Sequence, residues 1–148
     1  MLDLKELNIE TISQTLNKYL IDHEIDEDGD IFIESPSRVY ISIVDDKRIL
    51  RIMSFIHGDS LKSIKDQDLN AFIEYLNGGS YTVKYAKLGR FNPSEAPKSL
   101  ICEYGMLLLG LIDESFLIRT IKHFEIEISE AKLLAPEFEN IKEMLEKK

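Results

Sequence analysis

Residues 31–56 read IFIESPSRVYISIVDDKRILRIMSFI, and this stretch decides the fold. Isoleucine and valine alternate with other residues at a period of two in three runs, which is the pattern of β-strands. The predicted strands span residues 31–34, 39–43 and 49–56. Proline and aspartate occupy the short connections between them, so we expect an antiparallel meander.

Helical spacing of apolar residues appears on both sides of this meander. A helix is predicted over residues 9–21, with Asn8 as its N-cap. A second helix carries an apolar stripe from Leu69 to Leu76. We expect Ser63–Asp66 to form its capping box, and Asn77–Gly79 to end it by allowing positive φ.

The C-terminal half continues with two strands and a long helix. Tyrosine and valine alternate with polar residues over 81–85, which predicts a strand with its tyrosines inward, and another strand is expected over 100–108. A loop with two prolines, residues 89–98, separates them. Asp113 is the expected cap of a helix that continues to Leu134.

The last residues, 136–148, are expected to form a tail helix. Pro136 suits the first turn of a helix, and Phe138, Ile141 and Leu145 would anchor it. The predicted order is therefore α-β-β-β-α-β-β-α plus a short C-terminal helix. We expect an α+β fold with a single antiparallel sheet of about five strands, in one domain over 1–148 with its core in 9–135.

Composition narrows the classes of function. The chain of 148 residues has a net charge of −9, which disfavours binding to nucleic acid or to an anionic membrane. The most hydrophobic run, Met106–Ile112, is too short to span a bilayer. The N-terminus has acidic residues where a signal peptide would be basic, and the chain has one cysteine, so we expect a cytoplasmic protein.

An acidic run at residues 24–31 resembles a calcium loop only in part. If Gly29 is aligned with the sixth position of an EF-hand, the twelfth position, which should be glutamate, is Ser35. Pro36 and a predicted strand follow where the second helix should be. A solvated acidic turn is the expected structure.

No residue type in the chain is arranged as a reactive site. The three histidines are far apart in the sequence, and Cys102 lies within a predicted strand, where cysteine is usually a small core residue. Glu103 interrupts an apolar run, and we expect it to face outward or to pair with Arg119 or Lys84. We therefore predict no catalytic residues, no metal site and no cofactor, and no binding of nucleic acid by the aromatic and basic run at 81–91.

Three segments resemble the YbjN-domain proteins, which share the type III secretion chaperone-like fold. The segments are Asp26–Ile33, Arg38–Ile41 and Asp46–Arg51. The order of elements is similar over residues 9–134. The resemblance implies a binding module, since secretion chaperones of this fold are small acidic homodimers that hold a segment of another protein, and YbjN-like proteins are described as regulators.

The leading hypothesis is a non-enzymatic protein-interaction domain, chaperone-like or regulatory, that forms a homodimer and binds another protein. Tyr40, Met53 and Phe55 are the candidate interaction patch, because they alternate with the face that carries Ile41 and Ile52. The alternative for these three residues is that a helix covers them. The alternative functions are a small-molecule-binding regulatory domain, or an enzyme whose acidic residues come together only in the folded chain.

Overall fold

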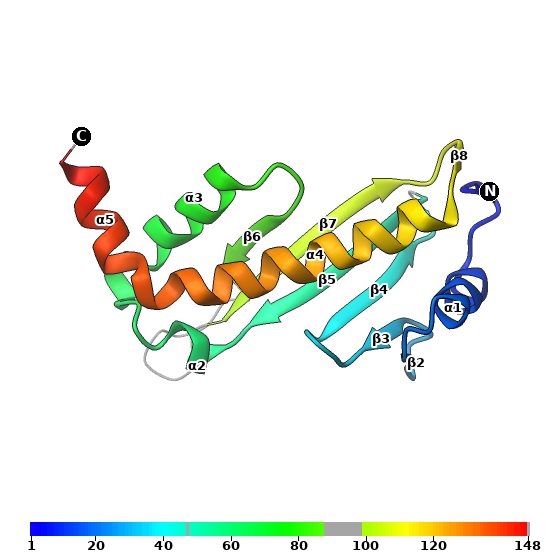
Figure 1. The fold of residues 1–148 in the computed structure, drawn as a ribbon, viewed down its shortest axis with the longest axis horizontal. Coiled ribbons are helices and arrows are strands. Elements are labelled where there is room, and N and C mark those ends of the chain that lie inside the picture. Colours follow the sequence, from blue (N-terminus) through cyan, green and yellow to red (C-terminus); the bar gives the residue numbers. More distant parts are fainter. Residues whose placement is uncertain (47, 88–98, 148) are drawn as a thin grey trace. The chain divides into compact units, whose positions relative to one another are not determined.

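The computed structural model describes residues 1–46, 48–87 and 99–147, and its elements are shown in Figure 1. It divides into two compact units: unit 1 comprises Met1–Ser54 and Glu103–Ile126, and unit 2 comprises Phe55–Cys102 and Glu127–Lys148. This division concerns compactness and not independent folding, so the expectation of one domain stays a prediction.

The fold is α+β with a mainly antiparallel sheet, as the sequence predicts. The main sheet has six strands in the order β2-β3-β4-β5-β7-β6. These strands are β2 (Glu24–Ile25), β3 (Ile31–Ile33), β4 (Val39–Val44), β5 (Ile49–Ile56), β6 (Lys84–Lys87) and β7 (Leu100–Leu107). Within this sheet, β2 is not predicted from the sequence, because a strand of two residues is too short to show alternation.

Unit 1 has its core on one face of the meander. The register pairs Ile41 with Ile52, both of which are fully buried. Along β5, buried residues alternate with half-exposed ones, so only one face of this strand is excluded from water. The buried side chains of α4 (Glu114–Leu134) include Leu117 and Ile121 in this unit. Each such side chain stabilises the fold by about 1.5–3 kcal/mol relative to exposure.

The N-terminal helix, α1 (Ile9–Lys18), begins where the sequence predicts and ends earlier. Asn8 is the N-cap, and its side-chain oxygen accepts a hydrogen bond from the backbone N–H of Thr11 at 2.8 Å. The prediction of helix to Ile21 is wrong because Leu20 adopts φ 59°, in the left-handed region, which ends the helical run. Unit 1 also contains a two-stranded sheet of β1 (Leu2–Asp3) and β8 (Leu111–Ile112).

Unit 2 contains α2 (Gly58–Leu61), the 3₁₀ turn Asp66–Asp68 and α3 (Leu69–Gly79). The predicted capping box is wrong, because Lys65 and Asp68 are the N-cap residues of the 3₁₀ turn and of α3, while the Ser63 hydroxyl donates to the carbonyl of Ala135 at 3.2 Å. The helix ends at Gly79, as predicted, but not through a positive φ: the glycines of the described residues with positive φ are Gly29 and Gly110.

The strand predicted over 81–85 is shifted toward the C-terminus, since β6 begins at Lys84. Tyr85 is buried as expected, whereas Tyr81 is fully exposed. The side-chain amide of Asn77 binds both backbone groups of Tyr85, accepting from its N–H at 2.8 Å and donating to its carbonyl at 2.9 Å. The predicted loop at 89–98 lies outside the described residues.

The tail is helical, with a 3₁₀ turn at Ala135–Glu137 followed by α5 (Phe138–Glu146). Phe138 anchors it as predicted: its ring centroid lies 5.2 Å from that of Phe72 and 6.1 Å from that of Tyr75. Leu145 does not, since it is 52% exposed. Within the described residues, no helix combines the length and apolar character needed to cross a membrane.

Candidate functional site

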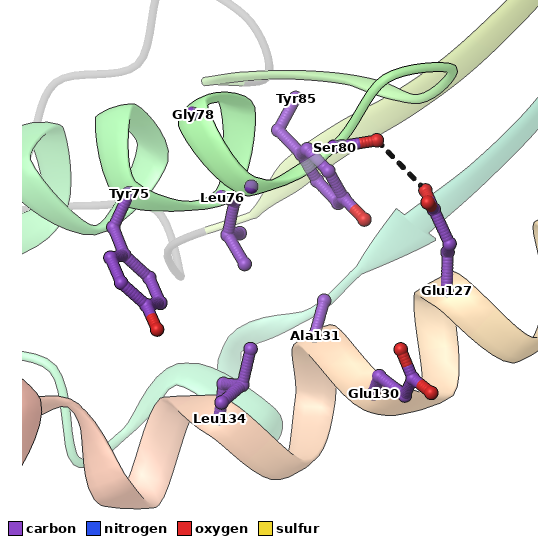
Figure 2. A pocket seen from close by; sticks show the side chains of 10 residues that line it. Tyr75, Leu76, Gly78, Ser80, Tyr85, Glu127, Glu130, Ala131 and Leu134 are labelled. Atoms are coloured by element: carbon purple, nitrogen blue, oxygen red, sulfur yellow. Dashed lines mark hydrogen bonds between the residues drawn. The ribbon is translucent and has the colours of Figure 1, made fainter.

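An open groove in unit 2 lies between the end of α3, β6 and the part of α4 that follows Ile126 (Figure 2). We call it the α3–α4 groove. Its volume is about 460 Å³. The described residues that line it carry apolar, hydroxyl and carboxylate side chains.

Small residues leave the space that this groove occupies. Gly78 and Gly79 line the groove at the end of α3, and a Cβ atom added to either would have no neighbour within 4 Å. On α4, Ala131 lies between Glu127 and Leu134 at positions i, i+4 and i+7, and its short side chain lies on the same face as theirs. Leu76, Ala131 and Leu134 provide the apolar part of the lining.

Ser80 fixes one end of the α3–α4 groove. Its hydroxyl donates to the Glu127 carboxylate (Oε2) at 2.9 Å, which is the dashed line in Figure 2. The Ser80 hydroxyl oxygen also accepts a hydrogen bond from the backbone N–H of Val83 at 2.9 Å. The end of α3, the start of β6 and α4 are therefore joined at this residue.

Tyr85 supplies a buried polar group. Its side chain is 3% exposed, and Figure 2 shows the ring directed from β6 toward α4, with the hydroxyl in the groove. No hydrogen bond to this hydroxyl occurs among the described residues. Burial raises the pKa of Tyr85, with further contributions from Cys102 and from the carboxylates Glu127 and Glu130, so the phenol stays neutral at physiological pH.

Of the predicted interaction patch of Tyr40, Met53 and Phe55, the structure places two residues side by side. Tyr40 and Met53 are directly opposite each other in the β4–β5 register, half-exposed, on the face opposite Ile41 and Ile52. The Tyr40 ring also lies against Phe32, with centroids 5.0 Å apart. Phe55 belongs to unit 2, where its ring stacks on His57 at 6.0 Å.

A second hollow, of about 690 Å³, lies in unit 1 beside the end of α1 and β3. Its histidine, His23, is already engaged: one ring nitrogen lies 2.9 Å from the carbonyl of Ile21, and the other lies 2.6 Å from the Ser13 hydroxyl. The α3–α4 groove is the better candidate because its described lining combines apolar side chains with hydroxyl and carboxylate groups.

The residues considered for reactive chemistry have structural roles. Cys102 is fully buried, and burial raises its pKa to about 12, so the thiol is neutral and not nucleophilic. Glu103 forms an ion pair with Arg51, which corrects the predicted partners Arg119 and Lys84.

The acidic run forms a turn of its own. The Asp26 carboxylate accepts the backbone N–H groups of Asp28 and Asp30, and Gly29 adopts φ +82°. Across residues 1–46, 48–87 and 99–147, no three histidine, cysteine or acidic residues are grouped so that they could hold a metal ion.

The fold matches solved structures, although the sequence matches no protein-family model and no curated protein. YbjN from E. coli, described as a candidate transcription regulator, superimposes with a TM-score of 0.68 at 13% identity, over 90% of this chain and 94% of the other. An uncharacterized protein from Methanothermobacter thermautotrophicus superimposes with a TM-score of 0.61 at 16% identity, over 88% of this chain and 98% of the other. These identities bear on the fold alone, and the chain has the YbjN-like fold.

Proposed function

We propose that this chain is a non-enzymatic protein-interaction domain, chaperone-like or regulatory, and that it binds a segment of another polypeptide in the α3–α4 groove. The observation that carries this proposal is the mixed lining of the groove. Leu76, Ala131 and Leu134 offer apolar surface, while Tyr85 offers a hydroxyl that is directed into the groove (Figure 2). A polypeptide segment supplies both apolar side chains and hydrogen-bonding groups, which is the combination found at protein interfaces.

The groups around the groove favour binding over catalysis. A serine nucleophile needs a base that removes its proton, commonly a histidine. Ser80 instead donates to the Glu127 carboxylate and accepts from the backbone N–H of Val83, and none of the described residues that line the groove is a histidine. This arrangement orients Glu127 and does not activate Ser80.

A regulatory role through protein contacts accords with the charge of the chain. The YbjN structure is described as a candidate transcription regulator. With a net charge of −9, direct contact with DNA phosphates is electrostatically unfavourable, so regulation by binding a protein is the better proposal. We also propose a homodimer, to be tested by light scattering coupled to size-exclusion chromatography.

A small-molecule-binding regulatory domain is the second candidate. The volume of about 460 Å³ falls within the range of ligand pockets, roughly 300–1,000 Å³. Thermal-shift screening against small metabolites tests it. A metabolite that stabilises the wild-type chain but not Gly79→Trp would favour this candidate.

The main test is selection from a library of short displayed peptides, carried out with three forms of the full chain. Gly79→Trp adds an indole at a position that lines the α3–α4 groove and at which an added Cβ atom has no neighbour within 4 Å. Gly105→Trp is the matched control in unit 1, on the exposed part of β7. We expect peptides to be enriched by the wild type and by Gly105→Trp but not by Gly79→Trp.

Two results would contradict the proposal. If the wild type enriches no peptide, the chain does not bind polypeptide segments of this kind. If Gly79→Trp enriches the same peptides as the wild type while Gly105→Trp does not, the binding surface is the outer face of the sheet and not the groove. Circular dichroism of both variants establishes that each is folded.

A further inference from the structure

We infer that the homodimer forms through an antiparallel pairing of α4 with the α4 helix of a second copy of this chain. This inference rests on the proposed function, of which the homodimer is a part, and it names the surface involved. The surface is a stripe of exposed residues along the helix, which we call the α4 stripe. It comprises Phe116, Arg119, His123, Ile126, Glu130 and Leu133.

The α4 stripe follows one side of a single helix. α4 has 21 residues, and Figure 1 shows it as one uninterrupted helix. The six residues stand at positions i, i+3, i+7, i+10, i+14 and i+17, a spacing that keeps side chains on one face of a helix. The buried side chains of the same helix, such as Leu117, Ile121 and Phe124, lie on the other side. The α4 stripe is therefore the solvent face of α4.

The apolar members of the α4 stripe are exposed to water. Phe116 is 49% exposed, Ile126 is 56% exposed and Leu133 is 73% exposed. Large apolar side chains that share an exposed face mark a contact surface for another protein. Their spacing is that of the a and d positions of a coiled coil, so the partner that fits this surface is a second helix.

The order of side chains along the α4 stripe is its own complement when a second copy is turned end to end. If Phe116 comes opposite the second copy's Leu133, then Arg119 comes opposite the second copy's Glu130. His123 likewise comes opposite the second copy's Ile126. These matches follow because the two members of each pair are equally far from the middle of the stripe. A two-fold axis at that point repeats every contact, as in an isologous dimer.

Charge favours a second copy in this antiparallel register. Each chain has a net charge of −9, so two copies repel one another unless their shared face brings opposite charges together. The antiparallel register does so twice, since Arg119 of each copy comes opposite Glu130 of the other. On one flank Lys122 comes opposite Ser129, which adds no contact between like charges. A parallel pairing would instead place Arg119 opposite Arg119 and Glu130 opposite Glu130.

The test is sedimentation equilibrium of the full chain, from low to high micromolar concentration. Ile126→Lys places a charge near the centre of the pairing, and we expect it to raise the dissociation constant of the dimer about tenfold or more. Met144→Lys is the matched control, since it makes a similar change at a position on α5 that is 66% exposed. We expect it to dimerise like the wild type. Circular dichroism establishes that each variant is folded.

Two charge reversals test the register itself. Arg119→Glu and Glu130→Arg should each raise the dissociation constant about tenfold, because each places like charges opposite one another twice in the symmetric dimer. An equimolar mixture of the two variants should dimerise as tightly as the wild type. In the mixed dimer, opposite charges meet at both places. A substitution that acted by disturbing α4 within its own chain would not be rescued by mixing.

A wild type that dimerises equally well with Ile126→Lys and with either charge reversal would overturn this inference while leaving the homodimer in place. Failure of the mixture to dimerise, when each variant alone is weakened, would overturn the antiparallel register. A wild type that stays monomeric at high micromolar concentration would overturn both the inference and the homodimer, and would leave the α4 stripe to a partner of different sequence. The binding of a polypeptide segment in the α3–α4 groove is decided separately, by the peptide selection with Gly79→Trp.

Discussion

Replacing Glu125 by methionine should stabilise the protein at neutral pH. Glu125 lies on α4 and is 3% exposed, and neither of its carboxylate oxygens has a hydrogen-bond partner in the described structure. Its ion-pair partner is Lys122, at 3.5 Å from Oε1, and that lysine side chain is 48% exposed. The carboxylate is therefore buried with little compensation.

The expected increase in the free energy of unfolding follows from two opposing contributions. Burying a polar group without a partner costs about 1–3 kcal/mol, and more for a charged one. An ion pair with a solvent-exposed lysine returns about 0.2–1 kcal/mol. Methionine has a similar length and a high helix propensity. We therefore expect Glu125→Met to raise the free energy of unfolding by about 1–2 kcal/mol at pH 7.

The increase in stability produced by Glu125→Met should depend on pH. Burial raises the pKa of Glu125 above its ordinary value of 4.5, against the opposing effect of Lys122. The folded state then holds the proton more tightly than the unfolded state, so stability is lost as pH rises from 4.5 through the folded-state pKa. The difference between variant and wild type should consequently grow between about pH 4 and pH 7.

Urea denaturation at a series of pH values measures this difference, with Glu143→Gln on the exposed side of α5 as the control. Because the other acidic residues are common to both chains, the difference isolates Glu125. A variant that is less stable than the wild type at neutral pH, or a difference that does not change with pH, would refute the reasoning.

Three further perturbations test packing and backbone conformation. Phe138→Ala should lower the free energy of unfolding, measured in urea, by about 3–5 kcal/mol, because Phe138 is buried against Phe72. Leu145→Ala, at an exposed position, should lower it by less than about 0.5 kcal/mol, and equal effects of the two variants would contradict the anchoring role of Phe138. Cys102 should react with a thiol reagent only when the chain is unfolded in urea, because its thiol is buried and its pKa is about 12, and rapid labelling of the native protein would show that the strand opens. Gly29→Ala should destabilise the chain by about 1 kcal/mol because of its φ of +82°, whereas Gly78→Ala in α3 should stabilise it by about 0.5–1 kcal/mol; the opposite signs would mean that the turn and helix conformations are misassigned.

The elements that the sequence predicts well are those with a strong local pattern. The strand over 49–56 and the helix ending at Leu134 have the predicted bounds or nearly so, since alternation or a helical stripe continues over eight residues or more. The errors occur where long-range contacts decide. Ser63 resembles a cap but binds Ala135, which is 72 positions away in the chain. The strand β2 has two residues and is formed through its pairing with β3.

The candidate site is harder to predict from the sequence than the fold. The sequence predicts that Asn77–Gly79 end the helix, and α3 does end at Gly79, but it does not indicate that Gly78 and Gly79 line a groove. The groove combines residues from positions 75–85 and 127–134, and nothing local indicates that these two segments lie together. The hydrophobic alternation of β4 and β5 instead predicts an interaction patch that includes Tyr40 and Met53, and these two residues lie on the face opposite the core of unit 1.

Mapping the binding surface with a peptide selected by the wild-type chain tests the central claim most directly. Backbone amide shifts in NMR spectra of the full chain would be followed as that peptide is added. Binding in the α3–α4 groove predicts that the largest shifts fall at residues 75–80, at Tyr85 and at residues 127–134. Shifts concentrated at Phe32, Tyr40 and Met53, with the groove unchanged, would contradict the account.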